Sequence, residues 1–207
     1  MAGTTTNYGW TYPTSTDLVK DGATAIQTAT QGVDTTLFTA LGGAYPGLRL
    51  VKKQTIGSAV ASVTVTGAFS ATYENYKIII SGGVSSADCY LRMQLGATAT
   101  GYSGAMWYST PYTATTLTIA NDNSVAQFSY AGEGRGSQYL AMNLDLIGPF
   151  LTKYTRVATN FAYQTANGVG IYNGIQGSAT SFTDFTISTN TGTITGGTIY
   201  VYGYGIS

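Results

Sequence analysis

From Leu48 onward the sequence alternates short apolar stretches with turn residues, and helical periodicity does not return. Short strands with this punctuation favour an antiparallel β-sandwich or jelly-roll-like fold, so we expect a mainly β head domain over residues 48–207. The predicted strands are Leu48–Ile56, Ala59–Thr66, Tyr76–Ser81, Cys89–Leu95, Thr116–Ile119, Ala126–Tyr130, Gln138–Leu146, Thr155–Tyr163, Val169–Ile175, Phe182–Ser188 and Thr198–Tyr204. The predicted turns include Ser81–Gly83, Asn121–Asn123, Asn167–Gly168, Asn173–Gly174 and Gly196–Gly197.

Some of these strands are apolar on both faces. Ile78, Ile79 and Ile80 are continuous, and in the last strand Ile199 and Val201 alternate with tyrosines. One face of such a strand lines the core of a sandwich. The other face then needs cover, and we expect a subunit interface to supply it.

Before this region, the periodicity from Thr16 to Leu41 is helical, with apolar residues recurring at intervals of seven. Thr16 or Asp17 is suited to cap the start, and Gly42–Gly43 to end the helix. Internal glycines and threonines weaken the helix, so it needs a packing partner. We assign residues 17–41 to a short helical trimerisation segment that forms a trimeric bundle, with packing on the chain's own β domain as the alternative. The predicted trimerisation residues are Val19, Ile26, Val33 and Leu37.

The segments on either side of this helix have different compositions. Residues 1–16 carry Tyr8, Trp10 and Tyr12 in a stretch too short for a core, and we interpret them as an arm that docks onto another protein. Residues 42–47 are predicted to be a linker. The start of the chain lacks the basic and apolar regions of a secretory signal, and no apolar stretch approaches membrane-spanning length. We expect no membrane insertion.

Charge is scarce in this chain. Charged residues make up 9% of the sequence, and 9 lysines and arginines balance 9 aspartates and glutamates. A chain with so little charge has no field to attract nucleic acid, and we expect no nucleic-acid partner. Low charge also promotes association, which favours an obligate oligomer. The single cysteine, Cys89, excludes an intrachain disulfide and is assigned no role.

The residues needed for common catalytic sites are sparse. The chain has no histidine, which removes the commonest general base and zinc ligand. We therefore expect no enzyme, no cofactor and no metal site. A carbohydrate depolymerase with two carboxylates is the remaining catalytic alternative. Its candidate acids lie far apart in the sequence and are Glu74, Asp88, Asp122, Glu133, Asp145 and Asp184.

Two segments are candidates for receptor binding. Between Gly101 and Thr113 the aromatic residues Trp107, Tyr108 and Tyr112 occur with glycine, serine and proline, as in a loop where flat rings stack on sugars. The alternative is that Trp107 plugs the end of the sandwich. Glu133 and Arg135 stand in a glycine-rich stretch interpreted as a flexible hairpin tip with solvated charges, and they form the second candidate.

Two stretches resemble a known family. The N-terminal one is composed of Gly9–Trp10, Tyr12–Pro13, Asp17–Val19, Asp21–Gly22, Ala25–Ile26 and Val33–Thr35. It resembles the N-terminal segment of minor tail and tail-fibre proteins of long-tailed bacteriophages. The closing stretch Gly197–Gly205 resembles the terminal strand of phage β-domains. Together they cover under a quarter of the chain, which differs from the family pattern in its short arm and in encoding no long fibre shaft.

The resemblance implies a virion protein that is assembled in the host cytoplasm. It implies a trimeric β-rich head after a short helical segment, and frequently adhesion to the host surface, where a glycan is the expected receptor. The arm would then dock onto other virion proteins of the tail or the capsid. A capsid decoration or head-fibre protein without a receptor role is the alternative location.

Overall fold

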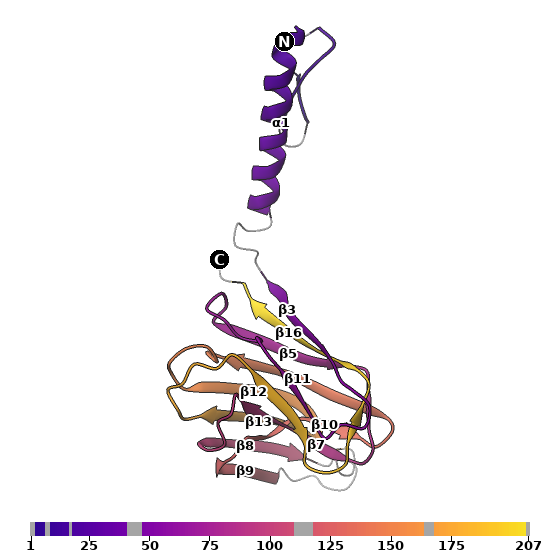
Figure 1. Cartoon of the computed structure of the whole chain (residues 1–207), viewed down its shortest axis with the longest axis vertical. Coiled ribbons are helices and arrows are strands. Elements are labelled where there is room, and N and C mark those ends of the chain that lie inside the picture. Colours follow the sequence, from indigo (N-terminus) through magenta and orange to yellow (C-terminus); the bar gives the residue numbers. More distant parts are fainter. Residues whose placement is uncertain are drawn as a thin grey trace. The chain divides into compact units, whose positions relative to one another are not determined.

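The computed structural model describes residues 3–6, 9–16, 18–40, 47–109, 118–163 and 168–205. The chain divides into two compact units, residues 1–47 with 205–207 and residues 48–204 (Figure 1). We call them the N-terminal unit and the β-sandwich unit.

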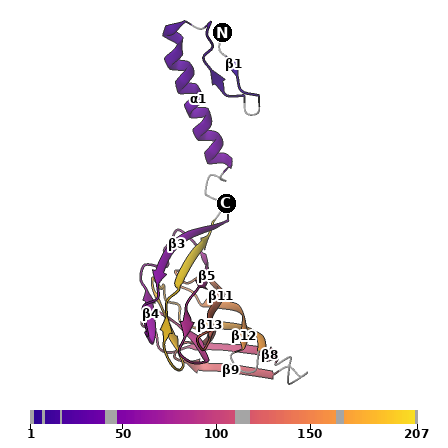
Figure 2. The ribbon, with the colours of Figure 1, turned by 90° about the vertical axis from the view of Figure 1, so that its right-hand side faces the viewer.

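The N-terminal unit is one helix with a small hairpin packed against it (Figure 2). Helix α1 spans Val19–Ala40, within the range that the periodicity predicts. Strands β1 (Gly3–Thr4) and β2 (Thr11–Tyr12) form the hairpin. Most half-buried residues of the helix are small and recur every three or four positions; the half-buried set is Gly22, Ala25, Ala29, Gly32, Val33 and Thr36. Of the two glycines inside the helix, Gly32 lies against the ring of Trp10, and nothing lies within 4 Å of the Cβ position at Gly22.

The β-sandwich unit contains a twelve-stranded antiparallel sheet that folds into two layers at the hairpin between β10 and β11. Figure 1 shows the long layer as a ladder of strands, and Figure 2 shows the unit from the side. In order across the sheet, the long layer is β3 (Leu48–Thr55), β16 (Thr198–Tyr204), β5 (Asn75–Ser81), β11 (Tyr139–Ile147), β12 (Thr155–Tyr163), β13 (Gly168–Gln176), β8 (Tyr102–Ser109) and β9 (Thr118–Val125). The short layer is β4 (Ser62–Val65), β14 (Phe185–Thr189), β7 (Cys89–Leu95) and β10 (Phe128–Arg135). A separate pair joins β6 (Val84–Ser85) to β15 (Ile194–Thr195).

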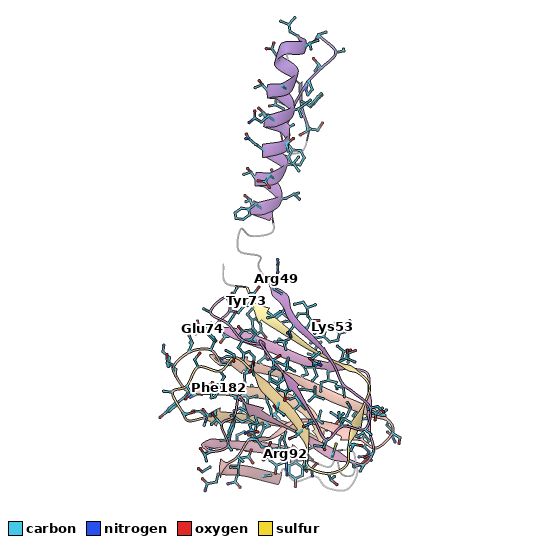
Figure 3. All side chains as sticks on the ribbon, in the orientation of Figure 1. Arg49, Lys53, Tyr73, Glu74, Arg92 and Phe182 are labelled. Carbon is cyan, nitrogen blue, oxygen red and sulfur yellow. The ribbon has the colours of Figure 1, made fainter. Side chains whose placement is uncertain are left out.

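One buried cluster lies between the two layers. Side chains alternate between buried and half-buried along β7, as expected for a strand with one face in a core. Leu91, Met93 and Leu95 of β7 belong to the same buried cluster as Ile78 and Leu144 of the long layer. Figure 3 shows the side chains of both layers, and Arg92, labelled there, belongs to the alternate, half-buried set of β7. The prediction of a mainly β, antiparallel sandwich after a short helix is confirmed.

Several local predictions were wrong, among them one loop and two turns. Residues 102–109, interpreted as loop, form strand β8. The predicted turns at Asn121–Asn123 and Asn173–Gly174 lie inside β9 and β13. The reason at Asp122 is a long-range contact, because its buried carboxylate accepts hydrogen bonds from Tyr172 Oη (2.7 Å) and from the backbone amide of Ser129 (3.0 Å). These hydrogen bonds satisfy the buried carboxylate, so Asp122, a residue type common in turns, is stable inside a strand.

Gly104 on β8 makes this contact possible, and its replacement is a test of the arrangement. A Cβ atom at Gly104 would lie 2.5 Å from Tyr172 Oη and 2.8 Å from the backbone oxygen of Asn173. We expect Gly104→Ala to lower the free energy of unfolding by about 1–3 kcal/mol, as overpacking of a filled core does. Urea denaturation measures the difference. Gly177→Ala is the control, because its Cβ would make only an ordinary 3.6 Å contact, and equal stability of the two variants would contradict this packing.

Candidate functional site

The outer face of the long layer, turned away from the core, is the surface on which candidate binding residues meet. Along β8, Tyr102 and Met106 are buried, so the alternate residue Trp107 points to the outer face. On β13, buried Tyr172 places Ile171 and Asn173 on the same outer face. The further outward residues around them are Asn143 and Asp145 on β11, Arg156, Ala158 and Asn160 on β12, and Ile119 on β9.

One end of this outer face is apolar. Trp107 lies opposite Ile171 on one neighbouring strand and opposite Ile119 on the other. Ile119 and Ile171 are 64% and 45% exposed, unusually high for large aliphatic side chains. A hollow of about 480 Å³ is lined here by Trp107, Ser109, Val169, Gly170 and Ile171. An apolar surface or a flat ring can therefore pack on this end.

The other end of the outer face is polar. A hollow of about 110 Å³ is lined by Lys77, Asn143, Asp145, Ala158, Thr159, Asn160, Ile171 and Asn173. Lys77 Nζ lies 3.1 Å from Asp145 Oδ2, and Tyr204 Oη donates to the other oxygen of that carboxylate. This pairing neutralises the local charge.

The asparagines of the polar end have free hydrogen-bonding groups. Asn143, Asn160 and Asn173 are exposed, and within the described part of the chain their side-chain amides make no hydrogen bond. A third hollow of about 340 Å³ is lined by Ser103, Gly104, Ala105, Arg156, Asn173, Gly174 and Ile175. Because Ile171 and Asn173 each line two of the hollows, the three adjoin one another on the outer face, and we call them together the groove.

The structure separates the aromatic residues predicted to bind a receptor. Trp107 and Tyr108 lie on strand β8, not in a loop, and they face opposite sides of the sheet. Tyr108 packs against the core cluster, so the prediction that it lies in an exposed binding loop was wrong. Trp107 lines a surface hollow, so the alternative in which it plugs the sandwich was also wrong. Tyr112 lies outside the described residues.

The second candidate pair does not form a solvated hairpin tip. Glu133 is 1% exposed on strand β10, and the turn itself follows at residues 136–138. Burial raises the pKa of Glu133 to about 7, although Tyr139 Oη donates a hydrogen bond to its Oε1 at 2.9 Å. Arg135 Nε lies 3.7 Å from Asp88 Oδ2. The prediction that Glu133 is a solvated receptor-binding charge was therefore wrong.

The predicted trimerisation residues lie on α1, and three of the four are exposed in the described chain. Val19 is 98% exposed and Ile26 59% exposed, Leu37 is also exposed, and Val33 is half-buried. Val19, Ile26 and Val33 recur every seven residues, as the residues of one coiled-coil position do, and Leu37 follows Val33 by four. We call Val19, Ile26, Val33 and Leu37 the helix seam.

The arm is not free in this chain. Trp10 Nε1 donates to Thr36 Oγ1 of α1 at 3.0 Å, and its ring lies over Gly32. The ring of Tyr12 packs over Gly3 in the hairpin. The contact that orders Trp10 is therefore the chain's own helix. Docking of the arm onto another protein stays a prediction, and Tyr8 lies outside the described residues.

The carboxylates considered for a glycosidase have local partners in most cases. Asp122, Glu133 and Asp145 are bonded as described above. Asp88 accepts from the amide of Gly136 at 3.0 Å, and Asp184 accepts from the amide of Gly67 at 2.7 Å. Within the described ranges, no cluster of histidine, cysteine, aspartate and glutamate side chains is arranged to hold a metal ion.

The chain matches no family model and has no significant match among curated proteins. In the part of the chain that the structure describes, no helix has the length and apolar character needed to cross a membrane.

Proposed function

We propose that this chain is a structural protein of a bacteriophage virion, a trimeric tail-fibre or minor tail protein that contributes to host attachment. The N-terminal unit supplies self-association and docking to the virion. The β-sandwich unit supplies the surface that meets the host.

The observation that carries the proposal is the uncovered helix seam. A monomer in water gains nothing from exposing Val19, Ile26 and Leu37 together, whereas a bundle of three helices buries each of them against its copies. Each buried aliphatic side chain contributes about 1.5–3 kcal/mol. The repeat supports a helical bundle, and the resemblance of the N-terminal segment to tail proteins favours three copies and a virion location.

The low charge of the chain is consistent with this assignment. With 9% charged residues and zero net charge, the protein repels its own copies weakly. Such a surface suits a protein that is built into a larger assembly. A capsid decoration protein would share these properties, so location on the particle distinguishes the two.

The division of labour between the two units is testable by truncation. A fragment beginning at Gly47 retains the whole sandwich core, so we expect it to remain soluble and to unfold cooperatively, but not to join particles in a complementation assay. Residues 1–47 fused to an unrelated trimeric protein are expected to be incorporated. Incorporation of the fragment beginning at Gly47 would show that the N-terminal unit is not the anchor.

A further inference from the structure

We propose that the groove on the outer face of the long layer binds a neutral oligosaccharide chain, with Trp107 as the stacking platform. The inference deepens the proposed function, since it names the ligand class and the surface used in attachment. It also stands on its own geometry, so it is tested on the isolated protein.

The apolar end of the groove matches the apolar face of a sugar ring. Trp107 is half-exposed and is flanked across the sheet by Ile171 and Ile119. An aromatic side chain held on a strand is rigid, so stacking on it costs little conformational entropy. The hollow of about 480 Å³ beside it gives room for a ring.

The polar end matches the hydroxyl groups that project from the same sugar chain. An asparagine amide offers two donors and an acceptor, which complements hydroxyl groups that both donate and accept. Asn143, Asn160 and Asn173 hold such amides without a partner in the described chain. Ala158 and Ala105 stand on either side of Asn173 across the sheet, and their small side chains leave its amide accessible.

The length and the charge of the groove indicate the length and the charge of the oligosaccharide that it binds. From β11 to β8 the groove crosses three strand spacings, about 14 Å, which suits a chain of several sugar rings and exceeds one ring. Lys77 is neutralised by Asp145, which leaves Arg156 as the uncompensated charge among the described lining residues. A polyanionic chain needs repeated cations, so the groove favours a neutral one.

A second copy of this chain fits the groove less well than a sugar does. Burial under a protein surface would strip water from three asparagine amides, each of which needs a new partner to avoid a desolvation cost. A hydrated sugar supplies those partners and still covers the apolar end. Interfaces of this mixed kind are wet and polar without being weak.

The test is binding of the full-length protein to an array of neutral and uronic-acid-containing bacterial oligosaccharides, followed by calorimetric titration of the best ligand. We expect neutral oligosaccharides to bind. Trp107→Ala is expected to weaken binding about tenfold or more, and Asn160→Ala and Asn173→Ala several-fold each. Asn123→Ala is the matched control, because this exposed asparagine lines none of the three hollows.

Three results would overturn the proposal. One is exclusive binding of anionic glycans, or of no glycan on the array. Another is equal affinity of Trp107→Ala and the wild-type protein for the best ligand. The third is a change in sedimentation mass on Trp107→Ala, which would assign the face to contacts between copies. The glycan-binding test uses the protein without phage particles. A negative result there does not decide whether the protein is part of a virion, and a negative imaging result does not decide whether the groove binds glycan.

Discussion

Replacing Ile26 with aspartate is expected to convert the proposed trimer of the full-length protein to a monomer at micromolar concentration. Ile26 lies in the middle of the helix seam and is 59% exposed in the single chain. In a bundle each copy would lose the burial of an aliphatic side chain, about 1.5–3 kcal/mol per copy. Each copy would also bring an unpaired carboxylate to the axis, where like charges repel and are poorly solvated. Sedimentation equilibrium measures the mass.

Gln27→Asp is the matched control for this variant. Gln27 is the exposed neighbour of Ile26 and lies off the seam, so it adds the same charge to the same helix without reaching the axis. The control is expected to remain trimeric. A trimeric Ile26→Asp protein, or a monomeric wild type, would show that the helix seam does not hold the copies together.

A second large effect is expected at Glu133, whose ionisation should make the protein less stable as the pH rises. Burial raises the pKa of this carboxyl from 4.5 to about 7 in the folded chain. The folded state therefore binds the proton more tightly than the unfolded state does. The stabilisation is fully present below pH 4.5 and is lost as the pH rises toward about 7. The loss is on the order of 3 kcal/mol, since each pKa unit corresponds to about 1.4 kcal/mol.

Glu133→Gln removes this titration while keeping an acceptor for the hydroxyl of Tyr139, which lies 2.9 Å from Oε1 of Glu133. We expect the variant to be more stable than the wild type at pH 8, and its stability to change less between pH 5 and pH 8. Thermal denaturation across this range measures both effects. The exposed carboxylate of Glu74 gives the control Glu74→Gln, which should keep the wild-type slope. An unchanged slope in Glu133→Gln would show that Glu133 is ionised in the folded chain.

Three strands have the bounds that the sequence predicts, and in one of them, Cys89–Leu95, every inward residue is apolar. Cys89–Leu95, Thr155–Tyr163 and Thr198–Tyr204 have the predicted bounds. Strand β8 escaped prediction because Gly104 occupies one of its inward positions and interrupts the alternation between Tyr102 and Met106. The reason for that glycine is Tyr172, which lies far away in the sequence. Local patterns carry no information about such a contact.

The candidate groove depends on strand register, which a single sequence does not fix. Asn160 and Trp107 are brought to one face because both flank Ile171 across the sheet. The sequence predicted that Asn173 belongs to a turn. Its cross-strand partners Ala158 and Ala105 have no sequence feature that indicates a binding site. The apolar row on the helix could be predicted from the seven-residue repeat in the sequence. The contact of Trp10 with Thr36 could not be predicted, because an aromatic arm is equally compatible with docking onto another protein.

The most direct test of the proposed function is to locate the protein on purified particles of the phage that the proposal implies. Electron microscopy with gold-labelled antibody against the β-sandwich unit gives the position. The proposal predicts label at the tail, concentrated where the tail meets the host surface. Label distributed over the capsid would instead support a decoration protein, and particles without label would contradict a virion role altogether.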